Sequence, residues 1–171
     1  ISKFCFAVEA HTLKKKITSN DISFQYRQAV PFSDECIEIV DDTLTKFMKC
    51  VLGWEDFKFS FNKATIFSWF VYIRRNLDLE TIDLQNTISY MEFCRAYIKG
   101  KYKKVDNKYI KTFSSLQKKV PFFEVMLNTF NQRTSMGSTD ALSIIYRDII
   151  ITLFKDMMWN EKSALLQYTV E

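Results

Sequence analysis

Apolar residues recur along most of this chain at the three- and four-residue spacing of amphipathic helices. Capping residues, acidic first turns and terminal glycines mark where these helices begin and end. The pattern predicts five helices before residue 131: from a cap at Ser33 or Asp34 to Gly53, from Asn62 to Asn76, from about Thr81 to Lys99, from Asp106 or Asn107 onward, and from Pro121 to Phe130.

The stretch from Ser138 to Trp159 is the most apolar part of the chain. Its apolar residues form one stripe and two flanks, namely Leu142, Ile145, Ile149 and Leu153, with Ile144, Ile150, Ile151, Phe154 and Met157 beside them. A helix that is apolar over so much of its girth is normally buried on several sides. We therefore expect an all-α fold, a compact bundle of about six to eight helices around a central apolar helix over residues 138–159, capped by Ser138 or Thr139.

One polar pair, Arg147 and Asp148, interrupts this central helix. A charge pair inside so apolar a helix must reach the surface, pair with neighbours or face a partner, because an unpaired buried charge is costly. The pair also leaves no apolar run near the roughly 20 residues that span a bilayer.

The chain ends are less regular than its middle. Apolar residues near the start fit either a strand or a helix, residues 23–30 suggest a short helix ended by Pro31, and Asn160 is the expected cap of a last short helix. We expect an accessory segment over residues 1–32 and a single helical domain over residues 33–171.

Composition agrees with helices and narrows the classes of function. The chain of 171 residues has 3 glycines, 2 prolines and 47% hydrophobic residues, which excludes disorder and disfavours a turn-rich β fold. Its four cysteines form no CxxC pair, so we expect reduced thiols and an intracellular protein, cytoplasmic or nuclear. A single histidine, His11, and three scattered glycines argue against a catalytic triad, a His-pair metal site and a phosphate-binding loop. We expect no enzyme activity, no metal and no cofactor.

Positive charge is concentrated in one band. Eight lysines and one acid between Lys99 and Lys119 give this band a net charge of +7, although the whole chain carries only +4. Lysines that alternate with tyrosines are typical of surfaces that neutralise phosphates and stack on bases. An alternative prediction is therefore a nucleic-acid site formed by Lys99, Lys101, Tyr102, Lys103, Lys104, Lys108, Tyr109 and Lys111. A solvated helix face and a surface for an acidic protein are the other interpretations of the band.

The segment KATIFSWFVYIRRNLDLETIDLQNTISYMEFCRAY resembles the first two helices of a cyclin box of the single-box type. Residues 88–93, ISYMEF, resemble the family's "A-x-x-Y-hydrophobic-D/E-R" element, with Phe93 in place of the arginine. Residues 116–119 stand where the family has "L-A-S-K", and residues 137–159 resemble its fifth helix. The resemblance implies a five-helix box that docks a kinase, with Lys118 or Lys119 as the contacting lysine and Asp148 as the nearest acid.

We therefore expect a non-enzymatic protein–protein interaction module, a divergent cyclin-like regulatory subunit that docks a kinase or another helix-bearing protein. The expected partner-binding residues are Glu92, Lys118, Lys119 and Asp148. Two alternatives stay open beside it. One is nucleic-acid binding through the lysine band, and the other is a Bcl-2-like groove for an amphipathic helix, which requires a long exposed apolar channel.

Overall fold

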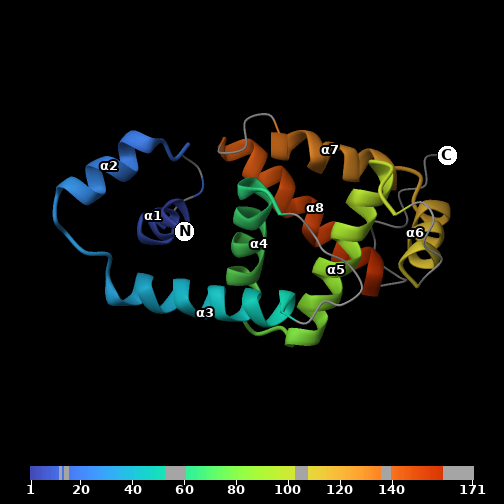
Figure 1. Cartoon of the computed structure of the whole chain (residues 1–171), viewed down its shortest axis with the longest axis horizontal. Helices are drawn as coiled ribbons and strands as arrows, with labels where there is room; N and C mark the ends of the chain where they lie inside the picture. The colour runs from blue at the N-terminus through green and yellow to red at the C-terminus, as the bar shows by residue number, and fades with distance from the viewer. Residues whose placement is uncertain (12, 14–15, 53–60, 103–107, 136–139, 160–171) are drawn as a thin grey trace.

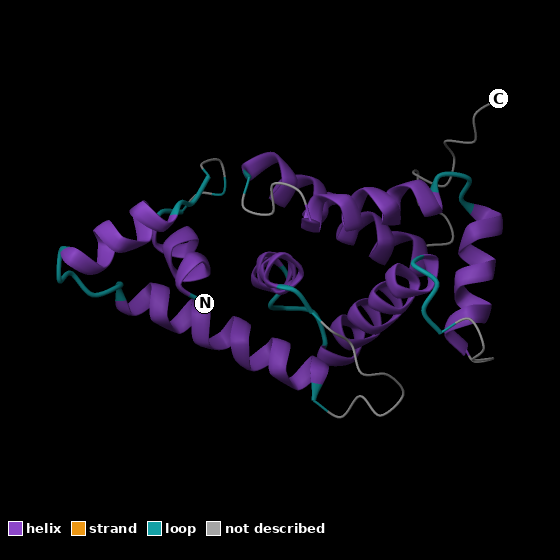
Figure 2. Ribbon diagram, turned by 45° about the horizontal axis from the view of Figure 1, so that its top comes forward, coloured by secondary structure: helices purple, strands orange, loops and turns teal. Residues whose placement is uncertain are grey.

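The computed structural model describes residues 1–11, 13, 16–52, 61–102, 108–135 and 140–159. These residues form eight helices and no strand (Figures 1 and 2). The helices are α1 (Ser2–Glu9), α2 (Ser19–Arg27), α3 (Asp34–Val51), α4 (Lys63–Arg75), α5 (Thr81–Ile98), α6 (Lys108–Lys119), α7 (Phe123–Ser135) and α8 (Ala141–Trp159). The predicted all-α fold is confirmed.

Side-chain caps fix the first turns of α3, α4 and α8. Ser33 Oγ accepts a hydrogen bond from Cys36 N at 3.2 Å, and Asn62 Oδ1 accepts one from Thr65 N at 2.8 Å, as the sequence predicts. Such caps satisfy backbone donors that have no partner within the helix. In α8 the capping acceptor is the Asp140 carboxylate, 3.2 Å from the backbone nitrogen of the third helical residue, whereas the predicted caps at 138 and 139 lie outside the described residues.

Several other boundaries differ from the sequence prediction. Residues 2–9 are helical, which is one of the two alternatives that the sequence left open. Helix α2 begins at Ser19, because Thr18 and Asp21 form a reciprocal capping box upstream of the expected start. Pro121 lies two residues before α7 instead of opening it. The short helix expected after Asn160 lies outside the described residues.

The interior of the bundle is built on α4 and α5. Figure 1 shows these two helices between α3 on one side and α7 with α8 on the other. All six residues from 68 to 73 in α4 are buried, and so are all five from 91 to 95 in α5. A helix buried over consecutive residues has neighbours on every side, so α4 and α5 are the most enclosed elements of the described chain.

Helix α8 is buried along one face and exposed along the other. Its inner face carries the flanking residues named from the sequence, which are Ile144, Ile150, Ile151, Phe154 and Met157. The stripe of Leu142, Ile145 and Ile149 faces outward, with Leu142 61% exposed and Ile149 47% exposed. The expectation that α8 is buried on several sides is therefore wrong for this stripe, because only the opposite face packs on α4, α5 and α7.

The first two helices lie at the end of the molecule formed by the start of α3 (Figure 2). Helix α1 contributes Phe4 and Val8 to the hydrophobic core, whereas α2 has no buried residue. The division at residue 33 stays a prediction. Among the described helices, none is both long and apolar enough to cross a membrane.

Candidate functional site

The most distinctive surface of the described chain is the outward side of α8, which we call the outer face. It consists of Leu142, Ile145, Tyr146 and Ile149, all exposed. Residues three, four and seven positions apart lie on the same side of a helix, so these side chains form one continuous apolar strip. Such contiguous exposed apolar surface is typical of sites that bind another molecule.

The direction in which this strip points is fixed by Arg147, which is fully buried. Its Nε donates to Ser68 Oγ of α4 at 2.7 Å, and its Nη1 donates to the carbonyl oxygen of Arg133 at 2.6 Å. That carbonyl belongs to the last turn of α7, where carbonyls lack partners within the helix and the helix dipole favours a cation. Burial and the neighbouring Arg95 lower the pKa of Arg147 to about 10, so the guanidinium is still charged at neutral pH.

One edge of the outer face carries a cation over an aromatic ring. The Arg133 guanidinium lies 4.9 Å from the centre of the Tyr146 ring, and it also donates to Ser143 Oγ at 3.5 Å. Attraction between a guanidinium and the face of a tyrosine ring restricts both side chains. Tyr146 is therefore held against the surface while its ring remains half accessible.

The other edge carries an ion pair between α4 and α8. Arg75 Nη2 donates to Asp148 Oδ1 at 2.9 Å and to Thr152 Oγ1 at 3.2 Å. Burial raises the pKa of Asp148, and the Arg75 charge and its hydrogen bond oppose that shift. Arg147 and Asp148 thus point to different neighbours, and the apolar strip runs between two polar edges.

Glu92, an expected partner-binding residue, lies inside the bundle instead. It is 7% exposed, and its Oε1 accepts hydrogen bonds from Trp69 Nε1 at 2.9 Å and from Arg95 Nη1 at 2.5 Å. Arg95 also donates to Asn131 Oδ1 at 3.0 Å and lies over the Phe130 ring. This network joins α4, α5 and α7 and leaves Glu92 almost no exposed surface.

The remaining expected docking residues do not form one surface. Lys118 and Lys119 are exposed at the end of α6, and Lys119 lines a groove beside the end of α8 with Tyr90 and Trp159. Asp148 is bound to Arg75 in the middle of α8. The structure therefore separates the lysines from the acid with which the resemblance groups them.

The lysine band is exposed, but its tyrosines are not. Lys99, Lys101, Lys108 and Lys111 lie at the surface, while Lys103 and Lys104 fall outside the described residues. The rings of Tyr97, Tyr102 and Tyr109 all stack on Phe93, with centroids 5.7, 5.8 and 5.2 Å away. These contacts use ring surface that stacking on bases would need, which weighs against the nucleic-acid alternative.

The described residues contain neither a disulfide nor a cluster of metal ligands. All four cysteines are free, and burial raises the pKa values of the Cys36 and Cys50 thiols to about 11. Thiols at such pKa values are protonated and poorly nucleophilic at neutral pH. Within the described residues no group of three or more histidines, cysteines and acids could hold a metal ion.

A scan against protein-family models, a search of curated proteins and a search of solved structures each found no match. The similarity to the cyclin box therefore stays a prediction.

Sequence reasoning identified the strip on α8 but not its direction. The direction of the strip could not be predicted, because Ile144, Ile150 and Ile151 are as apolar as the strip and either side of the helix could have been the buried one. Arg133 and Tyr146, which form one edge, were missed altogether, since they lie on different helices and only the fold brings them together. One feature of the sequence could have indicated which side of α8 is buried. Ser143 and Arg147 are four residues apart and so share one side of the helix, and that side makes polar contacts inside the bundle.

Proposed function

We propose that this chain is a protein–protein interaction domain whose docking surface is the outer face of α8. The observation that carries the proposal is the exposure of Leu142, Ile145 and Ile149 on a helix whose opposite face is part of the hydrophobic core. A helix so firmly held presents its apolar side chains in a fixed arrangement, and pre-organised surfaces lose less entropy on binding.

The spacing of these side chains favours a helix as the bound element. Leu142, Ile145 and Ile149 are separated by three and then four residues, and the half-buried Leu153 continues the strip after four more. Side chains at this spacing form the ridge that packs into the groove of a facing helix. From Leu142 to Leu153 the strip is about 16 Å long, given the rise of 1.5 Å per residue.

The composition of the surface is that of a protein interface. Its centre is aliphatic, and its edges carry Arg133 with Tyr146 on one side and Arg75 with Asp148 on the other. Interfaces typically have an apolar core and a polar rim, and arginine and tyrosine are enriched among the residues that dominate binding.

A second copy of this chain is the partner that the strip fits best. In an antiparallel pairing centred near Arg147, Leu142 lies opposite Leu153 of the other copy, and Ile145 lies opposite Ile149. The surface is thus self-complementary, as a two-fold symmetric dimer requires. One helix face is smaller than the roughly 800 Å² per partner of a standard interface, so we expect a weak dimer that depends on concentration.

The test is the oligomeric state of the chain and of its Ile149→Asp variant, measured by sedimentation equilibrium over a concentration series. An aspartate at the centre of the strip would be buried without a partner in the dimer, which should weaken association at least about tenfold. Ile82→Asp is the matched control, because Ile82 is 58% exposed on α5 and lies outside the strip. A chain that stays monomeric at all concentrations, or equal effects of the two substitutions, would contradict the proposal.

A further inference from the structure

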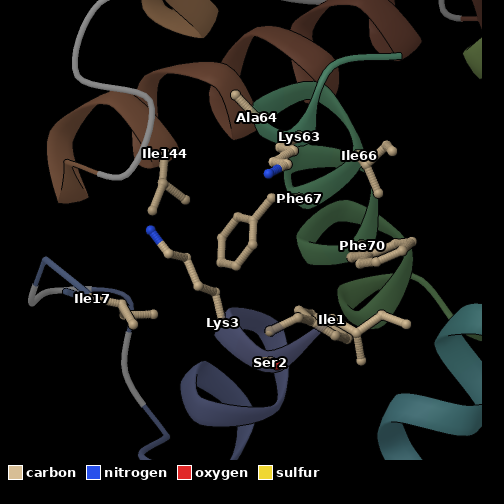
Figure 3. A pocket seen from close by; sticks show the side chains of 11 residues that line it. Ile1, Ser2, Lys3, Ile17, Lys63, Ala64, Ile66, Phe67, Phe70 and Ile144 are labelled. Carbon is tan, nitrogen blue, oxygen red and sulfur yellow. The ribbon is translucent and has the colours of Figure 1, made fainter. Parts of the chain in front are cut away.

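A cavity of about 480 Å³ lies between α1, α4 and the start of α8. Its lining includes residues 1–4 of the chain, Ile17, five residues of α4 and Ile144 (Figure 3). Ile144 belongs to the inner side of α8, so the cavity is separate from the outer face. Its volume falls within the range of sites that hold small molecules, about 300–1,000 Å³.

The walls of this cavity are mostly apolar. Its interior is formed by buried side chains, namely Phe4, Ile17, Ala64, Phe70 and Ile144. Phe67 and Ile66 are half-buried and complete the wall contributed by α4. An apolar chain placed here would lose its contact with water on several sides, which is favourable in proportion to the area removed.

Among the described residues of the lining, the charged side chains are those of Lys3 in α1 and Lys63 in α4. Figure 3 shows both amino groups pointing into the space beside the Phe67 ring. No acid is among the described lining residues, and neither ammonium group has a hydrogen bond or an ion pair with any residue that the structure describes. Two ammonium groups beside one apolar wall favour the binding of an anion there.

We propose that this cavity binds a free, single-chain anionic amphiphile of the fatty-acid class. Its carboxylate would lie between the Lys3 and Lys63 ammonium groups, and its alkyl chain would pack along Phe67 toward Phe4 and Phe70. Hydrogen bonds to charged groups are stronger than those between neutral groups, and the apolar wall excludes water on one side. The site thus selects for a negative head joined to an apolar body.

A single chain suits the size of the cavity better than a lipid in a bilayer. The inner wall consists of side chains that are at most 7% exposed, from Ile144 with 2% to Ala64 with 7%. A volume of about 480 Å³ accommodates one short alkyl chain, whereas a lipid held in a membrane keeps its chains in the bilayer. A free fatty acid and a membrane lipid offer the same chemistry, and the experiment below gives a different result for each.

The test is isothermal titration calorimetry of the chain with dodecanoate, compared with dodecanol and dodecyltrimethylammonium, which share the alkyl chain but lack the negative head. We expect dodecanoate to bind and the other two to bind at least about tenfold more weakly. Lys3→Gln and Lys63→Gln should each lower dodecanoate affinity by about tenfold, as the loss of one charge-assisted hydrogen bond predicts. Lys49→Gln is the matched control, since Lys49 is exposed on α3 and does not line the cavity.

Thermal unfolding of each variant, followed by circular dichroism, verifies that the fold is kept, and these exposed or half-buried lysines should tolerate the change.

The proposal is overturned if dodecanoate does not bind, if dodecanol binds equally well, or if all three lysine variants behave alike. Vesicles of phosphatidylglycerol form the second arm. Cosedimentation with vesicles that requires Lys3 and Lys63, without binding of free dodecanoate, would assign the site to a membrane lipid and overturn the proposal of a free ligand.

Discussion

Arg147 of α8 donates a hydrogen bond from Nε to the Oγ atom of Ser68 in α4, at 2.7 Å, in the interior of the bundle. The contact joins two residues that are 79 positions apart along the chain. A buried guanidinium must keep its hydrogen bonds, so α8 cannot rotate about its axis without a large cost. The exposure of Leu142 and Ile149 on the opposite side follows from this restraint.

The first prediction concerns Ser68→Ala, which removes an acceptor from the buried Arg147. We expect the free energy of unfolding to fall by about 2 kcal/mol, because a buried charged donor left without a partner costs more than an ordinary hydrogen bond. Urea unfolding followed by circular dichroism measures the change.

Ser89→Ala is the matched control for this variant. Ser89 is also buried in a helix and donates to a backbone carbonyl, that of Asn86, as Ser68 does to Ala64. Of these two serines, Ser68 alone accepts a hydrogen bond from a guanidinium among the described contacts. Equal losses for the two variants would show that the Arg147 contact contributes nothing measurable.

The second prediction concerns Tyr72, whose side chain is 1% exposed and packs edge-on against Trp69. Its hydroxyl is buried without a hydrogen-bond partner among the described residues. Tyr72→Phe keeps the ring and removes an unsatisfied polar group, so we expect stability to stay equal or to rise by up to about 1 kcal/mol. A clear loss of stability in urea unfolding would mean that the hydroxyl forms a stabilising contact.

The third prediction concerns the edge of the outer face at Asp148. Burial holds the pKa of this carboxyl above 3.8, so the folded state takes up a proton more readily than the unfolded state. The stabilisation from this proton uptake is fully present below pH 3.8 and is lost as the pH rises through the raised pKa of Asp148. Asp148→Asn has no carboxyl that titrates at this position. Between pH 3.8 and the raised pKa, its free energy of unfolding should therefore fall less with rising pH than that of the unsubstituted chain.

Arg75→Gln provides the converse test, because the Arg75 charge lowers the pKa of Asp148. Removing that charge should raise the pKa of Asp148 further, as measured by NMR titration. Arg75 is half exposed, so we expect a stability loss of no more than about 1 kcal/mol at neutral pH. An unchanged Asp148 titration would show that the ion pair is not populated in solution.

The fourth prediction has the opposite sign and concerns Glu9 at the end of α1. Its Oε2 accepts hydrogen bonds from Ser33 Oγ at 2.7 Å and from Ser33 N at 3.2 Å, and the hydroxyl contact is the main cause that lowers the pKa of Glu9 below 4.5. The stability from this contact is present above 4.5 and is lost as pH falls through the lowered value. NMR titration should find the Glu9 pKa below 4.5 and nearer to it in Ser33→Ala, whereas equal values would contradict the contact.

The sequence predicted local structure better than the arrangement of the helices. Ser33 and Asn62 marked helix starts because a cap acts within three residues of itself. The burial of Glu92 could not be predicted from the sequence, because it depends on Trp69 and Arg95, and the Trp69 contact spans 23 residues of chain. The cavity at Lys3 and Lys63 was equally out of reach, since the two lysines come together only when α1 packs beside α4.

The antiparallel pairing of α8 across a dimer is tested most directly by exchanging one aliphatic contact for a charge pair. Leu142→Lys and Leu153→Glu should each weaken association in sedimentation equilibrium, because each charge meets a leucine of the other copy. Within one copy these positions are about 16 Å apart, too far to pair. When both substitutions are combined in one chain, association should be stronger than in either single variant, because the symmetric dimer then contains two lysine–glutamate pairs. A double variant that associates no better than the weaker single one would contradict the proposed interface.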